Sequence, residues 1–262
     1  MKMWNILRAD GSRWFGKGKM WVIIAGTVAA HYLMMGQDAV TIPVSCILEM
    51  VYLYIDDPFF MVSLMLAVSL MGTSYCEEKE KNYFYFWIKR CSRRQYVCSK
   101  MFHAYGSAFV VLTTGVLLWI CSMRLFMPWA HPQSDYFFTI AERGMGELLL
   151  EGKYFLYFFL HALGIGMLGG VISAATFFIS LLLQDKMLVQ VFPILLYYVN
   201  TSFLPNYSPV WYKCSVSNIF YFINHPNSCP WRSVVTGAGI SVLLLFLFGV
   251  MADRILKRKG YD

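Results

Sequence analysis

Long runs without Lys, Arg, Asp or Glu alternate along the chain with short charged segments. A helix needs about 20 residues to cross roughly 30 Å of hydrocarbon, so each long apolar run predicts one membrane-spanning helix. The six predicted spans are residues 20–37, 58–76, 101–123, 154–184, 187–212 and 233–252. A further charge-free run, 214–231, contains Pro226 and Pro230, and we expect its backbone to break rather than cross.

The composition agrees with a membrane protein. The 262 residues are 58% hydrophobic and 14% charged, whereas soluble domains are about 45–50% apolar and about 25% charged. A soluble domain of this size could not cover so much apolar surface with a polar exterior. The composition argues against a cytosolic enzyme, a disordered chain and a fibrous protein. It predicts an all-α polytopic membrane protein with residues 1–262 as a single transmembrane domain.

The basic residues predict the orientation. Seventeen of the 22 Lys and Arg lie in segments that share one side if the N-terminus is inside, and Lys and Arg favour the cytoplasmic side. We therefore expect both termini in the cytoplasm and a multi-pass protein of the cell (plasma) membrane. The net charge of +7 is then mostly a topology signal. It favours the lipid bilayer as a partner and gives no separate basic face for nucleic acid.

Two segments are expected to lie on the membrane surface. Residues 1–19 mix Trp4, Leu7 and Trp14 with charged residues, which predicts an interfacial helix. Residues 39–57 have helix-like apolar spacing but also Glu49 and two aspartates. A full crossing at 39–57 would put the basic segment 77–100 outside, so we predict an outer-surface or re-entrant helix there.

Several catalytic patterns are incomplete. Residues 11–18 match GxxxxGK, but Gly18 stands where a phosphate loop has Ser or Thr. Glu77 and Glu78 are similar to the start of the EExxxR motif of CAAX-type membrane proteases, but Asn82 stands at the Arg position. The spans hold no carboxylate, which argues against an ion-coupled transporter. We expect no metal site and no catalytic residue, with an intramembrane hydrolase kept as an alternative.

Polar and small residues in the later spans suggest packing or a pathway. Ala162, Gly166, Gly170 and Ala174 form one small-residue stripe, which predicts close helix packing within the chain or, as an alternative, a dimer seam. Pro193 should kink its helix. The predicted span 187–212 also contains other residues that would either line a pathway or pack against neighbours: Gln190, Tyr197 and Asn200.

Two cysteines of one predicted outer loop could form a disulfide bond. Cys214 and Cys229 share one predicted outer loop. They would form a disulfide in an oxidising compartment and remain free thiols otherwise.

The segment 77–100 is the most informative part of the chain. It contains seven basic residues and also six consecutive bulky apolar ones, Tyr83 to Ile88. A solvated loop does not need such a run. We expect a short helix that lies against the membrane face or against another protein, with Lys89, Arg90, Arg93 and Arg94 projecting towards the cytosol.

This segment resembles the loop after the second span in permease subunits of type 2 ATP-binding cassette (ABC) exporters. The resemblance rests on the acidic start Glu77, Glu78 and Glu80, on the turn at Asn82, and on Ser92–Lys100, which reads SRRQYVCSK. Cys91 stands where the family often has Pro, and Asn82-Tyr83 replaces a common Gly-Thr pair. The family also has six spans, both termini inside and a surface helix before the first span.

The resemblance implies a transport subunit without its own nucleotide site. Residues 77–100 would form a cytoplasmic coupling loop that contacts a separate ABC ATPase subunit, which would bind ATP and Mg; this chain would hold no cofactor. The implied contact residues are Tyr83, Phe84, Trp87, Arg90, Arg93, Arg94 and Tyr96. A second permease subunit would complete a homodimer or heterodimer. Residues 128–152 and 205–232 would form an extracellular gate.

The expected function is export of an amphipathic or lipophilic cargo, such as a peptide, a drug or a lipid-like molecule. The alternatives are the intramembrane hydrolase and a non-transporting membrane scaffold or sensor.

Overall fold

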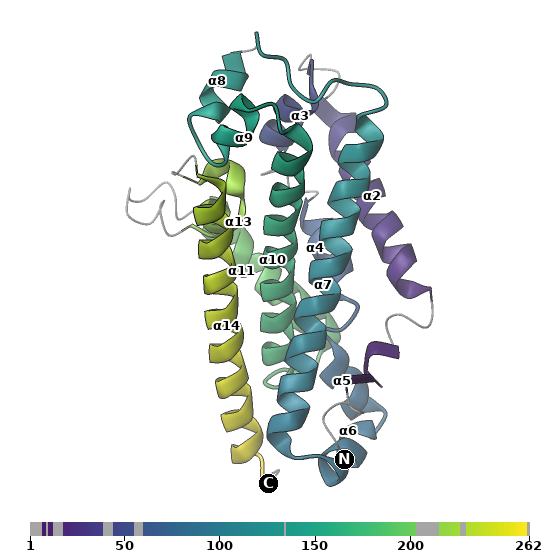
Figure 1. Cartoon of the computed structure of the whole chain (residues 1–262). Coiled ribbons are helices and arrows are strands. Elements are labelled where there is room, and N and C mark those ends of the chain that lie inside the picture. Colours follow the sequence, from purple (N-terminus) through teal and green to yellow (C-terminus); the bar gives the residue numbers. More distant parts are fainter. Residues whose placement is uncertain are drawn as a thin grey trace.

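Three long helices form the body of the molecule. The computed structural model describes residues 7–8, 10–12, 18–38, 44–54, 60–133, 135–202, 215–225 and 229–260. Within these ranges every regular element is a helix, so the all-α prediction is confirmed for them. Helices α7 (Arg93–Met123), α10 (Tyr154–Ser180) and α14 (Pro230–Arg258) run side by side along the long axis (Figure 1). All three are long and apolar enough to cross a membrane, as expected for a membrane protein.

Shorter helices pack against this body. They are α2 (Lys19–Asp38), α4 (Phe60–Val68) and α11 (Lys186–Ser202). The expected span 58–76 is not one helix: α4 ends at Val68, a turn follows, and α5 (Ser74–Glu80) begins after it. Gly72 lies in this turn, where an added Cβ would come within 2.8 Å of the Val68 carbonyl. The absence of charge identified this segment as apolar but did not locate its break, and the six-span topology stays a prediction.

Basic residues gather at one end of the molecule. This basic end consists of α5, α6 (Tyr83–Arg90), the first turns of α7 and the last turns of α14 (Figure 1). Most of the described Lys and Arg that the sequence assigns to the inner side lie there.

The opposite end carries short helices. It holds α3 (Ile47–Tyr54), α8 (Asp135–Ala141) and α9 (Gly146–Leu150) (Figure 1). Helix α3 has 8 residues, which is too short to cross about 30 Å of hydrocarbon. The first N–H groups of α3 donate to the carbonyls of Pro128 and Trp129 at 3.0 Å. This agrees with a helix within 39–57 that does not cross.

The run 214–231 is broken, as its prolines predict. Among its described residues it forms α13 (Val216–Phe220) and the short 3-10 helix η2 (Phe222–Asn224) before α14 begins. Phe220 and Phe222 are buried in the bundle. Gly164 of α10 allows this approach, because a Cβ there would lie 2.2 Å from the Phe220 carbonyl oxygen. Part of the expected outer gate therefore packs into the main core.

The small-residue stripe of α10 packs against α7. An added Cβ at Gly166 would lie 2.0 Å from Thr113 Oγ1, and one at Gly170 would lie 2.6 Å from the Tyr105 ring. Small residues let two helix backbones approach closely, so dispersion contacts accumulate along the interface. The intramolecular interpretation of this stripe is confirmed for Gly166 and Gly170.

Candidate functional site

A short helix occupies the middle of the segment 77–100, where the sequence predicts one. Asn82 adopts φ 58°, a left-handed conformation that Asn tolerates, and it separates α5 from α6. Helix α6 ends where Cys91 becomes extended. Ser92 then caps α7 through a capping box with Gln95, in which each side chain bonds the other's backbone N–H. Ser92 thus has a local role: it starts α7, the longest of the helices in the described residues.

Phe84 anchors α6 to the body. Its side chain is fully buried and makes edge-to-face contacts with the ring of Tyr85 beside it and with rings of two neighbouring helices. Its centroid lies 5.0 Å from that of Tyr75 in α5 and 5.5 Å from that of Tyr96 in α7. Burying a Phe side chain stabilises by about 1.5–3 kcal/mol, and aromatic pairs add to this. Helix α6 is therefore held against α5 and α7.

The opposite side of α6 carries exposed side chains. Tyr83, Tyr85 and Phe86 are 52%, 46% and 60% exposed, respectively. Lys89 and Arg90 are exposed on the last turn. We call these five residues the α6 outer face. Large exposed apolar side chains next to basic ones are typical of a surface that meets a partner or a membrane interface.

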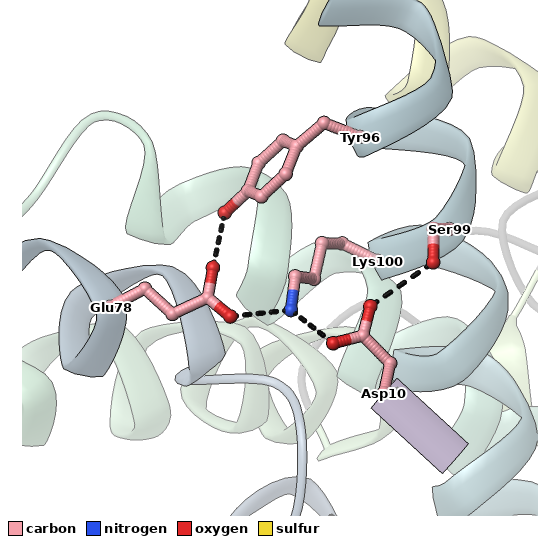
Figure 2. Close-up of polar contacts among 5 residues, drawn as sticks. All are labelled: Asp10, Glu78, Tyr96, Ser99 and Lys100. Atoms are coloured by element: carbon pink, nitrogen blue, oxygen red, sulfur yellow. Dashed lines mark hydrogen bonds and ion pairs between the residues drawn. The ribbon is translucent and has the colours of Figure 1, made fainter. Parts of the chain in front are cut away.

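A buried charge cluster lies on the side of α6 that faces α5 and α7. Lys100 Nζ donates to Asp10 Oδ1 and to Glu78 Oε1, each at 2.6 Å (Figure 2). Tyr96 donates its hydroxyl proton to Glu78 Oε2 at 2.9 Å, and Ser99 donates to Asp10 Oδ2 at 3.0 Å. We call these five residues the Lys100 cluster; all are buried. The cluster joins the N-terminal segment, α5 and α7 at one point.

The Lys100 cluster also touches α6. The Lys100 ammonium lies 5.8 Å from the Trp87 ring centroid and 5.7 Å from that of Tyr96. Both distances permit cation–π attraction, which strengthens when water is excluded. A buried ion pair adds little net stability, but removing one partner leaves an uncompensated charge and costs about 3–5 kcal/mol. The cluster thus links the N-terminal segment, α5 and α7 through hydrogen bonds between charged and polar side chains.

Sequence reasoning missed this cluster. No role was expected for Asp10, and Lys100 was expected only as the last residue of the basic segment 77–100 and of Ser92–Lys100. The available signal was the position of Lys100 directly before an apolar span, because a cation inside a helix bundle requires a nearby carboxylate.

The structure corrects several of the implied ATPase contacts. Phe84 and Tyr96 are fully buried, so neither can reach a separate subunit. Arg93 is also engaged within the chain: its Nε donates to Asp253 Oδ1 of α14 at 2.6 Å, and its side chain is 14% exposed. Trp87 is half-buried over the Lys100 cluster.

The remaining implied contacts are exposed but divide between two places. Tyr83 and Arg90 lie on the α6 outer face. Arg94 is exposed in the first turn of α7, where it lines a groove shared with α14. The surface available to a partner on α6 is therefore the α6 outer face.

An exposed ion pair links α5 to α11. Lys186 Nζ lies 2.5 Å from Glu80 Oε2. The hydrogen bond and charge of Lys186 lower the pKa of the Glu80 carboxyl, and Glu80 in turn raises the pKa of Lys186. Because both side chains are exposed, water and salt screen this pair and it contributes little.

The predicted pathway residues have partners within the chain. Gln190 Nε2 donates to the Met65 carbonyl of α4 at 3.0 Å, and Asn200 Oδ1 accepts from the Val216 N–H of α13 at 2.8 Å. The Tyr197 hydroxyl is hydrogen-bonded to that of Tyr221, and Pro193 is buried inside α11. These bonds fix α11 against α4 and α13, while a pathway role stays a prediction.

The predicted disulfide has one member outside the described residues. Cys214 lies there, and Cys229, which precedes α14, is a free thiol. The structure therefore has the free-thiol alternative at Cys229 and not the expected Cys214–Cys229 disulfide. Within the described ranges, no group of three or more His, Cys, Asp or Glu side chains is arranged to hold a metal ion.

Comparison of the chain with models of known families, with curated proteins and with solved structures gives no match.

Proposed function

We propose that this chain is the permease subunit of an ATP-driven exporter. A separate ATPase subunit in the cytosol binds α6 and drives the conformational change of the permease. One observation carries the proposal: Phe84 anchors one face of α6 in the body of the molecule, and the other face is exposed, aromatic and basic. A helix that is held rigidly, and whose exposed aromatic and basic side chains can bind a partner, can transmit a conformational change of that partner to the transmembrane helices. A mobile loop would absorb that movement instead.

The contacts of the basic end offer a route for such movement. A displacement of α6 would reach α5 and α7 through Phe84 and through the Lys100 cluster. It would continue to α14 through the Arg93–Asp253 ion pair. A partner can shift a membrane bundle between two conformations only by binding one of them more tightly. In this proposal, ATP binding to the partner supplies that difference.

The proposal includes a topology and an assembly. The basic end lies in the cytoplasm, in agreement with the preference of Lys and Arg for that side. The chain crosses the plasma membrane six times, and both termini are cytoplasmic. A second permease subunit, identical or similar, completes the pathway. Residues 128–152 and 205–232 form the extracellular gate. The cargo is amphipathic or lipophilic, because the candidate spans offer broad apolar surfaces.

The contacts of Glu78 do not favour the hydrolase alternative. Oε1 of Glu78 accepts from Lys100 and Oε2 accepts from Tyr96. A general base must reach a proton on its substrate or on water, and this carboxylate is instead buried among structural donors. A scaffold or sensor would also use an exposed aromatic and basic face, but its partner would not hydrolyse ATP in response to cargo.

Co-purification tests the proposed contact. The tagged chain is recovered from native membranes, and the recovered material is assayed for an ABC ATPase subunit, recognised by its GxxxxGK[ST] phosphate loop. The test variant, Tyr85→Ser/Phe86→Ser/Arg90→Glu, changes only the α6 outer face. The control, Tyr136→Ser/Phe138→Ser/Arg143→Glu, makes the same changes at exposed positions of the opposite end. We expect the first variant to lose most of the ATPase and the second to retain it. Equal recovery with both variants would contradict the proposal.

A further inference from the structure

A groove separates the first turns of α7 from the last turns of α14. Its volume is about 610 Å³, within the range of about 300–1,000 Å³ that is usual for ligand sites. The walls are apolar, with Met101 and Phe102 on α7 and Phe246 and Val250 on α14. Phe102 and Phe246 both line the groove. Their side chains are 65% and 67% exposed, so they lie at its open edge.

The groove has the length of one lipid leaflet. On α14 it extends from Leu245 to Arg254, which is about 14 Å at 1.5 Å per residue. Half of a bilayer core is about 15 Å. Arg94, Asp253 and Arg254 lie at the end of the groove that belongs to the basic end. The polar part of the groove therefore matches the depth of lipid headgroups, and the apolar part matches acyl chains.

The charge at this end is positive. Asp253 is the acidic lining residue, and Arg93 holds it at 2.6 Å. Arg94 Nε lies farther from the same carboxylate, at 3.8 Å, and the Arg94 side chain is 84% exposed. Arg254 is also exposed. Three guanidinium groups against one carboxylate leave an excess of positive charge, and guanidinium groups bind phosphate through paired N–H donors.

Gly249 keeps the middle of the groove open. A Cβ added at this position would meet no atom within 4 Å. Gly249 lies between the apolar wall and the arginines, so a larger side chain there would enter the space that an acyl chain needs.

We propose that this groove binds one anionic phospholipid. Its phosphate lies between Arg94 and Arg254, and one acyl chain runs past Gly249 between Phe102 and Phe246. The lipid would bridge α7 and α14 beside the Arg93–Asp253 pair. This inference goes beyond the proposed transport function and does not depend on it, because it requires only that α7 and α14 lie in a bilayer.

Native mass spectrometry of the full-length chain in detergent tests the headgroup. The chain is titrated with phosphatidylglycerol and, separately, with phosphatidylcholine of the same acyl chains. We expect phosphatidylglycerol to bind first and more tightly. Each basic residue near a headgroup contributes about fivefold in affinity. Arg94→Gln/Arg254→Gln should therefore weaken the first phosphatidylglycerol by about 25-fold and leave phosphatidylcholine almost unchanged.

Matched variants separate the groove from general charge. Lys81→Gln/Lys257→Gln removes the same charge from exposed positions at the same end and should change phosphatidylglycerol affinity less than about twofold, because neither residue lines the groove. Gly249→Leu fills the groove and should abolish the first lipid of either type. Gly239→Leu makes the same change in the same helix, also where a Cβ meets nothing within 4 Å. This control should retain the first lipid.

Four results would overturn the proposal. In the first, the two lipids bind equally well. In the second, the lysine control weakens phosphatidylglycerol as much as the arginine variant does. In the third, millimolar inorganic phosphate displaces the lipid, which would indicate a site for free anions. In the fourth, Gly249→Leu removes a dimer peak rather than a lipid adduct, which would make the groove an interface between two copies.

Discussion

Lys100 and Asp10 lie 90 residues apart in the sequence, yet the Lys100 ammonium donates to the Asp10 carboxylate at 2.6 Å inside the protein. Both side chains are inaccessible to solvent. The bond fixes the N-terminal segment to the first turns of α7, directly beneath α6. Side-chain contacts therefore connect the segments of the basic end to one another.

Removing the ammonium should destabilise the basic end strongly. Lys100→Met leaves the Asp10 and Glu78 carboxylates buried without their cation, which should cost about 3–5 kcal/mol. Thermal unfolding of the purified chain in detergent measures this loss. Lys81→Met, at an exposed position, should change stability by less than about 0.5 kcal/mol. If Lys100→Met and Lys81→Met have the same melting temperature, the Lys100 cluster does not hold these segments in place.

The pair Arg93–Asp253 should respond to charge reversal. Arg93→Glu places two carboxylates together and should destabilise by about 1.5–3 kcal/mol, since a hydrogen bond between charged groups is lost. Arg93→Glu combined with Asp253→Arg should recover part of that loss in the same melting experiment. Lys257→Glu, exposed on the same end of α14, serves as the control. A double variant no more stable than Arg93→Glu alone would argue against a direct pair.

The α7–α10 interface should not accept a large side chain at Gly166. In Gly166→Leu the new atoms would collide with Thr113 Oγ1 and the Phe109 carbonyl, and overpacking of this kind costs about 1–3 kcal/mol. We expect a lower yield of monodisperse protein after mild heating. Gly239→Leu, which has open space, should behave like the parent chain. Normal yield for Gly166→Leu would mean that α7 and α10 do not pack closely.

Two neighbouring phenylalanines should separate folding from partner binding. Phe84→Ala removes a buried ring and should cost about 3–5 kcal/mol, with loss of ATPase binding as a consequence. Phe86→Ala removes a ring that is 60% exposed; it should leave the melting temperature almost unchanged but still weaken ATPase binding. A combined measurement of melting and co-purification distinguishes the two effects. Equal melting temperatures would show that Phe84 does not anchor α6.

Thiol labelling should locate the two ends of the molecule. In a cysteine-free chain, Arg143→Cys, at an exposed position of the end opposite the basic end, should react with a membrane-impermeant maleimide on intact cells. A second variant, Lys81→Cys in a cysteine-free chain, should react only after the cells are opened. Labelling of position 81 from outside would place the basic end in the external medium and contradict the proposed orientation.

Periodicity and charge predict much of this fold. The absence of charge located α10 and most of α7 and α14, because a helix that crosses the hydrocarbon core must be long and apolar. Local chemistry located α6 and the start of α7, since Asn82 and Ser92 are a turn residue and a helix cap.

The internal faces were harder to predict. Six consecutive apolar residues do not reveal by composition that Phe84 is buried while Phe86 is exposed. Helical spacing would have grouped Phe84 with Trp87 and Ile88 on one face. The break after Val68 and the bond between Lys100 and Asp10 depend on which segments meet in space. Nothing in the local sequence specifies those meetings.

Photocrosslinking from α6 in native membranes tests the account most directly. We place p-benzoylphenylalanine at the position of Phe86 and, as a control, at the position of Phe138 on the opposite end, in cells of the native host, and identify the crosslinked proteins by mass spectrometry. Irradiation should join the ATPase to the chain from position 86 and not from position 138. Failure to capture the ATPase from position 86, or equal capture from both positions, would show that α6 is not the contact through which the protein is driven.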